Sequence, residues 1–228
     1  MARAIRPAFT SPTGPILQVK MRLVGISPMI WRRVLLPASW TLEELHGVIQ
    51  AAMGWEGLHL YEFRVRAARY GSPDLCAGAA DVTLESLRCR RHAKFIYTYD
   101  MGDGWEHEIR IEDRLEAENG RRYPVCVGGH GACPPEDCGG PGGYQARREE
   151  AMSSEAFEDV DTMATLLKEI VLDGRHELLD DADKRWELEA AVERSQARQP
   201  FLADGFSRRE VNARFHQDEH RRLMHQWY

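Results

Sequence analysis

The sequence predicts an α+β protein with a β-grasp-like β-β-α-β-β sheet domain, a Cys/Pro/Gly-rich loop and a helical C-terminal region. Three observations predict this class. Short segments in the first half of the chain alternate between apolar and polar residues, which is typical of half-buried strands. One capped amphipathic segment interrupts them. The second half then changes to the three- and four-residue apolar spacing of helices.

The predicted strands share a period of two residues. In the first of them, Leu17 and Val19 lie on one face, whereas Gln18 and Lys20 lie on the other. A Gly-Asp-Gly turn at residues 102–104 separates the last two strands and predicts a hairpin. The predicted strands are residues 16–24, 29–36, 58–66, 94–100 and 105–112.

A helix is predicted between the second and third strands. Thr41 and Glu44 have the spacing of a capping box, in which each side chain accepts a hydrogen bond from the other residue's backbone N–H. Apolar residues then recur at helical spacing over residues 42–53, and Gly54 stands where a C-terminal cap belongs.

The second half of the chain begins with residues 123–143, which are rich in Gly, Pro and Cys and predict irregular structure. Amphipathic patterns then predict helices at residues 157–172, 182–198 and 207–225. The predicted organisation is a flexible N-terminus at residues 1–15, a core domain at 16–146, and an acidic helical extension at 147–228 that packs on the core.

The net charge of −6 conceals an asymmetry along the chain. Residues 1–100 carry 13 Lys+Arg against 8 Asp+Glu, whereas residues 101–228 carry 17 against 28. An acidic protein is disfavoured as a non-specific nucleic-acid binder, because phosphate contacts need a surplus of positive charge. The first part of the chain still allows a local basic face.

Composition also bears on location and redox state. No segment approaches the roughly 18 apolar residues of a membrane span, and residues 1–14 lack the apolar centre of a signal peptide. We therefore expect a cytoplasmic protein without a membrane partner. The cysteine count of 5 is odd, which indicates reduced thiols or metal ligands rather than a disulfide framework.

A cluster of potential zinc ligands lies in the Cys-rich segment. Cys126, His130, Cys133 and Cys138 fall within thirteen residues, and four such ligands could close a tetrahedral Zn²⁺ site that orders the loop. Their spacing is not a standard one. The alternative is that the cysteines are small buried residues that pack under a Pro-Pro turn.

Two histidines on strand faces form a second candidate site. If their strands lie close together, His59 and His107 could bind a metal or form an acid–base pair with Asp100 or Asp103. The alternative is that the histidines belong to the core and that the aspartates form the turn.

A third candidate is a binding surface around Trp31, where Arg32 and Arg33 follow in the same strand. The strand period places Arg32 and Arg33 on opposite faces, so only one of them can join Trp31 in a single surface. The residues considered for this surface are Trp31, Arg32, Arg33, His59, Asp100, Asp103, Trp105, His107, Glu136 and Asp137.

Several stretches follow one another in a recognisable order. They are residues 25–63, which include WRRVLLP; residues 97–112, YTYDMGDGWEHEIRIE; residues 123–144, which include CPPEDCGGPGGY; and the short segment VNAR at 211–214. Together they resemble the plasmid pRiA4b ORF-3-like family, also named transposon-passenger "TnpR" proteins. The resemblance implies a compact α+β domain without an established activity, encoded on plasmids or insertion elements of bacteria and archaea.

The leading hypothesis is a non-enzymatic, mobile-element-associated binding module for a protein or nucleic-acid partner. The sequence contains no catalytic triad, P-loop, HExxH or dinucleotide-binding motif. The alternative is a zinc-binding protein with a structural or hydrolytic site from His59, His107, Asp103 and the 126–138 loop. The sequence leaves the partner and the oligomeric state open.

Overall fold

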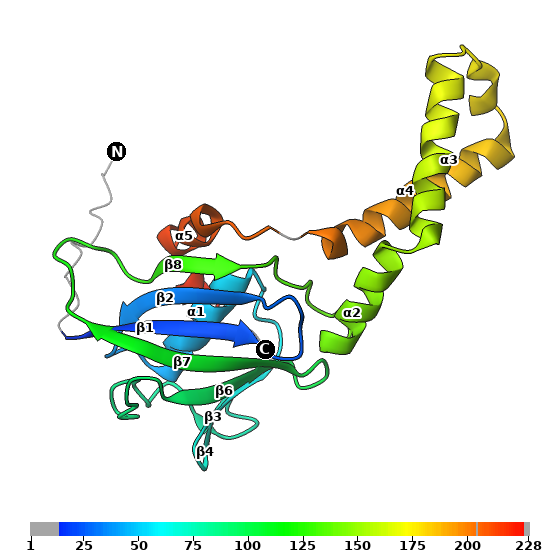
Figure 1. Cartoon of the computed structure of the whole chain (residues 1–228). Helices are drawn as coiled ribbons and strands as arrows, with labels where there is room; N and C mark the ends of the chain where they lie inside the picture. The colour runs from blue at the N-terminus through cyan, green and yellow to red at the C-terminus, as the bar shows by residue number, and fades with distance from the viewer. Residues whose placement is uncertain (1–13, 204, 226–228) are drawn as a thin grey trace, which may run out of the picture. The chain divides into compact units, whose positions relative to one another are not determined.

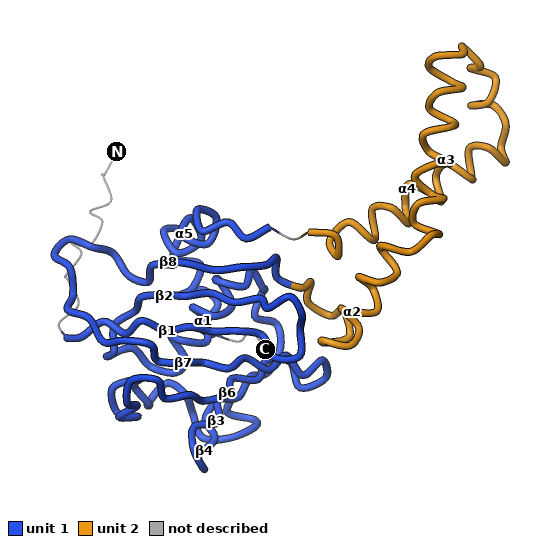
Figure 2. Tube along the Cα trace, in the orientation of Figure 1, with its two compact units in different colours: residues 1–133, 205–228 blue, residues 134–204 orange. Residues whose placement is uncertain are grey.

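The structure of the protein is a computed structural model that describes residues 14–203 and 205–225. The predicted N-terminal lead-in, residues 1–15, lies outside the described residues except for Gly14 and Pro15. Two compact units make up the chain (Figure 2). We call residues 1–133 and 205–228 the sheet unit, and residues 134–204 the helical unit.

An eight-stranded sheet forms the sheet unit, with the strand order β5-β4-β3-β6-β7-β1-β2-β8. Neighbouring strands pair antiparallel except for β4 and β5, which pair parallel. The predicted α+β class is therefore confirmed. The strands are β1 (Ile16–Leu23), β2 (Trp31–Pro37), β3 (Tyr61–Val65), β4 (Ala68–Gly71), β5 (Ala77–Gly78), β6 (Lys94–Tyr99), β7 (Trp105–Leu115) and β8 (Val125–His130).

Helix α1 (Leu42–Met53) crosses one face of this sheet (Figure 1) and has the predicted capping box of Thr41 and Glu44. Ten of its twelve residues are buried, because the sheet covers one side and helices α5 (Arg208–His216) and α6 (Glu219–Arg222) pack on the other. Gly47 permits this close packing, since a Cβ atom there would stand 2.0 Å from the carbonyl oxygen of His220.

Two histidines lie inside the core between α1 and the sheet. The His46 ring stacks on Tyr61 with 3.7 Å between ring centroids, and its Nδ1 lies 2.7 Å from the Tyr97 hydroxyl. Gln50 donates to the same hydroxyl oxygen at 2.8 Å, so the hydroxyl proton is available for a neutral His46. His107 is also fully buried, and burial lowers the pKa of both histidines to about 3.

Two sequence predictions about the second half of the chain are wrong. Residues 123–143 are not wholly irregular, because they contain β8 and the first turn of helix α2. The single helix predicted at 207–225 is two helices, α5 and α6, because the chain turns at Asp218, where φ is +58°. The aromatic end of that prediction, Trp227 and Tyr228, lies outside the described residues.

The helical unit contains helices α2 (Gly140–Ala151), α3 (Ser154–Val171) and α4 (Ala182–Leu202), with a short 3₁₀ helix at His176–Leu179. Helices α3 and α4 pack against each other. Asp159 of α3 is buried and accepts hydrogen bonds from Arg194 and Arg198 of α4, which lower the pKa of Asp159 to about 2. These ion pairs hold the two helices together.

The two units differ in charge and in extent from the predicted domains. The sheet unit has 22 Lys+Arg against 18 Asp+Glu, whereas the helical unit has 8 against 18. The boundary between the units falls at residue 133, whereas the sequence places it at 146, and α5 and α6 belong to the sheet unit. The acidic excess of the chain is thus concentrated in the helical unit.

The buried histidines predict a loss of stability in mild acid. Histidine in an unfolded chain has a pKa of about 6.5, whereas His46 and His107 have values of about 3 when folded. Between these values the unfolded chain binds more protons, so the free energy of unfolding falls as the pH falls. Each histidine should cost about 2 kcal/mol between pH values of about 7 and 5, as measured by urea unfolding.

The variant His107→Phe provides the control, because it keeps an aromatic ring in the cluster and removes one titrating group. It should lose about 2 kcal/mol less than the unmodified protein over the same pH interval. His220, buried with a pKa lowered to about 4, adds in the same direction in both proteins. Equal stability of the unmodified protein at both pH values contradicts the burial of neutral imidazoles.

Candidate binding surface

Some of the residues predicted for the binding surface are buried inside the sheet unit, and others lie on its outside. Trp105 and His107 are fully buried, and Arg32 is 3% exposed, so these three side chains lie in the interior. Trp31 and Arg33 are half-buried on the opposite face of the sheet. The predicted opposition of Arg32 and Arg33 is thus observed, and Arg33 is the one that shares a face with Trp31.

Arg32 binds three carbonyl oxygens inside the protein. Its Nε donates to Ala52 at the end of α1, at 3.1 Å, and its Nη1 donates to Trp31 and His130, at 2.9 and 3.0 Å. The guanidinium also stands 4.6 Å from the centre of the Phe206 ring. Burial lowers the pKa of Arg32 from its ordinary value. The geometry is that of a structural anchor.

The first part of the Cys-rich segment forms strand β8, which pairs with β2. A register shift in the pairing of β8 with β2 places Arg33 opposite Gly128 but Val34 opposite Cys126. Because of this bulge, Cys126 faces the interior while His130 is exposed, with its Nδ1 3.2 Å from the carbonyl oxygen of Met29. The structure does not bring these two predicted zinc ligands to one face.

The other two predicted zinc ligands lie further along. Cys133 is half-buried at the end of the first part of the sheet unit, and Cys138 is buried in the helical unit. Burial raises the pKa of the Cys126 thiol, which opposes the thiolate form that binds zinc. Glu136 is half-buried and Asp137 is exposed, both in the helical unit immediately before α2.

His59 and Asp100 form a pair at the rim of the sheet unit. The His59 Nε2 atom lies 3.7 Å from Asp100 Oδ2, and the His59 ring meets the Tyr99 ring edge-on. The other carboxylate oxygen of Asp100 accepts the backbone N–H groups of Gly102 and Asp103, at 2.9 and 3.3 Å. Asp100 therefore accepts hydrogen bonds in the turn with one carboxylate oxygen and faces His59 with the other.

His107 lies deeper in the core than this rim pair. Its ring contacts Trp55 at 5.4 Å between centroids, and Trp55 in turn stacks on Tyr99 at 5.2 Å. Tyr99 is the residue that contacts His59. The path of ring contacts from His107 to His59 therefore runs through Trp55 and Tyr99. His107 lies in the buried core, whereas His59 is partly exposed.

The outer face of the sheet presents Trp31 between two cations. Lys20 Nζ lies 4.6 Å and the Arg33 guanidinium 5.0 Å from the centre of the Trp31 ring, distances at which a cation is attracted to an indole. A Cβ atom at Gly128 would stand 3.5 Å from the same ring, so the indole lies beside the backbone of β8. We call Trp31, Lys20, Arg33 and their neighbours on this face the outer surface.

Ion pairs cross the strands of the outer surface. Arg33 donates to Glu112 at 3.0 Å, and Arg22 and Lys94 both donate to Glu108, at 3.1 and 2.9 Å. These donors lower the pKa values of Glu108 and Glu112. The carboxylates are thus held ionised and fix the directions of the arginine and lysine side chains around Trp31.

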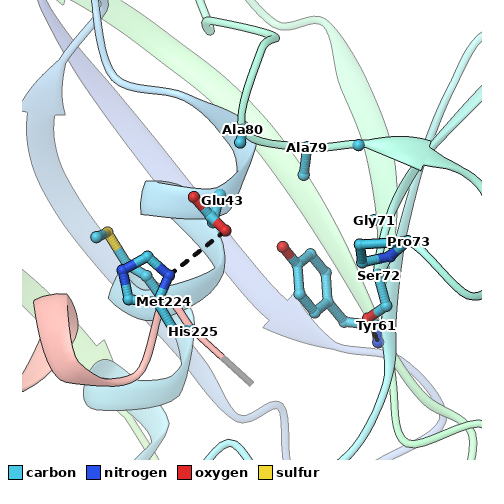
Figure 3. Close-up of a pocket in the computed structure, with 10 residues that line it drawn as sticks. Glu43, Tyr61, Gly71, Ser72, Pro73, Ala79, Ala80, Met224 and His225 are labelled. Atoms are coloured by element: carbon cyan, nitrogen blue, oxygen red, sulfur yellow. Dashed lines mark hydrogen bonds and ion pairs between the residues drawn. The ribbon is translucent and has the colours of Figure 1, made fainter. Parts of the chain in front are cut away.

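A cavity of about 220 Å³ in the sheet unit was not predicted from the sequence. Figure 3 shows the Tyr61 side chain extending from β3 toward Glu43 of α1, and the His225 ring 3.7 Å from the Glu43 carboxylate. The residues that line this cavity are Glu43, Tyr61, Gly71, Ser72, Pro73, Gly78, Ala79, Ala80, Met224 and His225. Sequence patterns could not find it, because its walls come from distant segments.

The sequence pattern of one known family matches most of the chain. The family is described as Plasmid pRiA4b ORF-3-like protein, and the match covers residues 15–180. The chain belongs to this family. The match extends beyond the motif at residues 123–144 and includes α2 and α3.

Two relatives of this pRiA4b ORF-3-like protein are informative. An uncharacterized protein, y4hQ, of Sinorhizobium fredii (strain NBRC 101917 / NGR234) is 46% identical over 136 residues, which cover 57% of this chain and 70% of the relative. The crystal structure of a protein of unknown function, MM3350, from Methanosarcina mazei Go1 is 34% identical with a TM-score of 0.57. It covers 64% of this chain and 86% of its own.

The short C-terminal motif of this pRiA4b ORF-3-like chain also has a structural explanation. Asn212 accepts the backbone N–H of Cys126 at 2.8 Å and donates to the carbonyl oxygen of the same residue at 2.9 Å. Arg214 donates to the Ala51 carbonyl oxygen at 3.4 Å, next to the one that Arg32 binds. The motif therefore fastens α5 to β8 and to the end of α1.

The contrast between Arg32 and Arg33 gives a prediction. Arg32→Met leaves buried carbonyl oxygens at Ala52 and His130 without their donor, and should lower the free energy of unfolding by more than about 2 kcal/mol. Arg33→Met removes a half-exposed ion pair and should cost less than about 1 kcal/mol. Urea unfolding of both variants measures the difference. Equal losses contradict the assignment of Arg32 as an anchor.

Within residues 14–203 and 205–225, no helix is both long and apolar enough to cross a bilayer.

Proposed function

We propose that this protein is a non-enzymatic binding module of a plasmid or other mobile element, and that its outer surface holds a single-stranded nucleic acid. The observation that carries the proposal is the position of Trp31 between Lys20 and Arg33 on a half-buried sheet face. A base that displaces one of these cations can stack on the indole, and the displaced cation can then contact a phosphate, so this arrangement suits a flexible polyanion.

Charge supports a negatively charged partner, such as a nucleic acid, over a neutral or basic protein. The sheet unit carries a positive excess although the whole chain is acidic. Arg22 lies opposite Trp31 and joins Lys20 and Arg33 as a third cation, and it shares Glu108 with Lys94 of β6. Two cations on one carboxylate leave a local positive balance on this part of the sheet.

The buried histidines support a binding role over a catalytic one. A general base must exchange protons near neutral pH and must reach its substrate. His46 and His107 are fully buried and have pKa values lowered to about 3, so they act as neutral packing groups. The residues with chemistry to offer a partner therefore lie on the outer surface and at the His59–Asp100 rim.

Fluorescence anisotropy with a labelled oligothymidylate of about 20 nucleotides tests this proposal. Trp31→Ala should weaken binding at least about fivefold, because stacking on one base contributes about 1–3 kcal/mol. The affinity should also fall steeply as salt is raised from about 50 to 200 mM, because each phosphate contact releases counterions.

Trp186→Ala is the matched control, since Trp186 is 71% exposed in the helical unit and should leave the affinity unchanged. An equal effect of the two substitutions removes the outer surface as the binding site. Absence of binding at low salt removes nucleic acid as the partner and leaves a protein partner for the same surface.

A second candidate function is metal binding at the rim. The observation that favours it is the 3.7 Å distance between His59 Nε2 and Asp100 Oδ2, which places an imidazole and a carboxylate as neighbouring donors. His107 is separated from this pair, so the rim candidate differs from the set of His59, His107 and Asp103 that the sequence suggests. The Cys126–Cys138 segment is the competing location.

Native mass spectrometry of untagged protein prepared under reducing conditions distinguishes these locations. A zinc ion that is lost in His59→Ala and kept in Cys133→Ser assigns the metal to the rim. The reverse pattern assigns it to the Cys-rich segment. A metal-free mass for the unmodified protein, with all 5 thiols free, contradicts both zinc hypotheses.

A further inference from the structure

Helix α3 carries two apolar stripes, and α4 covers one of them. The stripe that faces α4 contains Leu166 and the ion-paired Asp159, both buried, and continues through Ala156, Met163 and Ile170, which are half-buried. The adjacent stripe points to solvent within the helical unit. We call it the outer stripe; it consists of Phe157, Val160, Ala164, Leu167 and Val171.

The outer stripe is unusually exposed for its composition. The exposed fractions are 70% for Phe157, 53% for Val160, 63% for Leu167 and 61% for Val171. Contiguous apolar patches of this kind mark interaction sites, because leaving them in water sacrifices about 25 cal/mol per Å² of apolar area. The helices of the helical unit leave the outer stripe exposed, so a further helix can pack on it.

The spacing of the outer stripe defines the geometry of that helix. Its members follow one another at alternating intervals of three and four residues, which is the spacing of the a and d positions in a coiled coil. In this notation, Phe157, Ala164 and Val171 are a positions, and Val160 and Leu167 are d positions. A seam of this type is complementary to another helix of the same pattern, and the second copy of α3 supplies one.

We propose that the outer stripe is a homodimer interface, in which α3 of one copy packs antiparallel against α3 of a second copy. In an antiparallel seam each a residue faces a d residue. Ala164 then lies opposite Leu167 of the second copy, and Val160 lies opposite Val171. The small Ala164 thus meets the larger Leu167, and the two-fold axis repeats both contacts.

Charge complementarity selects the antiparallel orientation. Asp161 and Lys168 both follow a d position and flank the outer stripe on the side away from α4. In the antiparallel dimer Asp161 of each copy lies beside Lys168 of the other, which forms two opposite-charge pairs. In a parallel dimer the same residues would face the apolar side chains at the flanking positions Met163 and Ile170. The charges are thus placed for one orientation.

The N-terminal end of the outer stripe adjoins a groove in the helical unit. The groove has a volume of about 190 Å³, and Met152, Phe157, Val160 and Leu202 contribute its apolar wall. In the antiparallel register the end of the second α3 reaches this groove and brings Leu172, which is 76% exposed, close to Phe157. Dimerisation therefore covers the exposed residues at both ends of the seam.

Sedimentation velocity of the full chain tests the proposal. The seam spans only about four helical turns, so we expect a dissociation constant on the order of 10 µM. The mass should rise with concentration from 26.1 kDa toward twice that value. Leu167→Glu places a charge at the centre of the seam and should keep the protein monomeric throughout. Leu58→Glu is the matched control, because Leu58 is 66% exposed in the sheet unit and should leave dimerisation unchanged.

A charge exchange tests the orientation independently of stability. Asp161→Lys alone and Lys168→Asp alone should each weaken the dimer at least about tenfold, since each sets like charges side by side twice. The double variant Asp161→Lys, Lys168→Asp should regain the original affinity. Failure of the double variant to recover overturns the antiparallel arrangement.

Two other outcomes overturn the proposal as a whole. A protein that stays monomeric at all concentrations shows that something other than a second copy covers the outer stripe, such as another part of the same chain. A dimer that persists in Leu167→Glu shows that the contact lies elsewhere. Neither outcome bears on nucleic-acid binding, because the outer surface belongs to the other unit.

Discussion

A buried guanidinium joins the parts of the sheet unit that are most distant in sequence. Arg32 lies in the second strand, yet it holds the last turn of α1, the end of β8 and the aromatic ring that precedes α5. Arginine suits this position because its rigid fork of donors satisfies carbonyl oxygens from several directions. Gly129 leaves room for the Phe206 ring beside Arg32, since a Cβ at residue 129 would stand 2.5 Å from that ring.

The two faces of the sheet that carries Arg32 have different roles. The inner face is filled by aromatic rings and neutral histidines, and its polar groups are used to position α1. The outer face carries Trp31 and ion pairs whose members remain in contact with water. Successive residues of β2 therefore serve opposite purposes, and Arg32 and Arg33 are the clearest example.

Sequence reasoning predicted five of the eight strands and α1, because a two-residue or helical period is a local property, but it missed the short strands β4 and β5. It missed β8, whose glycine-rich segment has a weak pattern of its own and is held by Asn212, 86 residues away. It also assigned Trp105 and His107 to a surface, because a period shows which residues share a face without showing which face is covered. Pairing Lys20 with Trp31 needs the strand register, which no local pattern supplies.

The side chain of Asn212 has a consequence for solubility. β8 is the outermost strand at one side of the sheet, and such edges expose backbone groups that can pair with a strand of another molecule. Asn212 occupies both the N–H and the carbonyl of Cys126, as the backbone of a neighbouring strand would. This single amide thus keeps the backbone of Cys126 from pairing with a strand of another molecule.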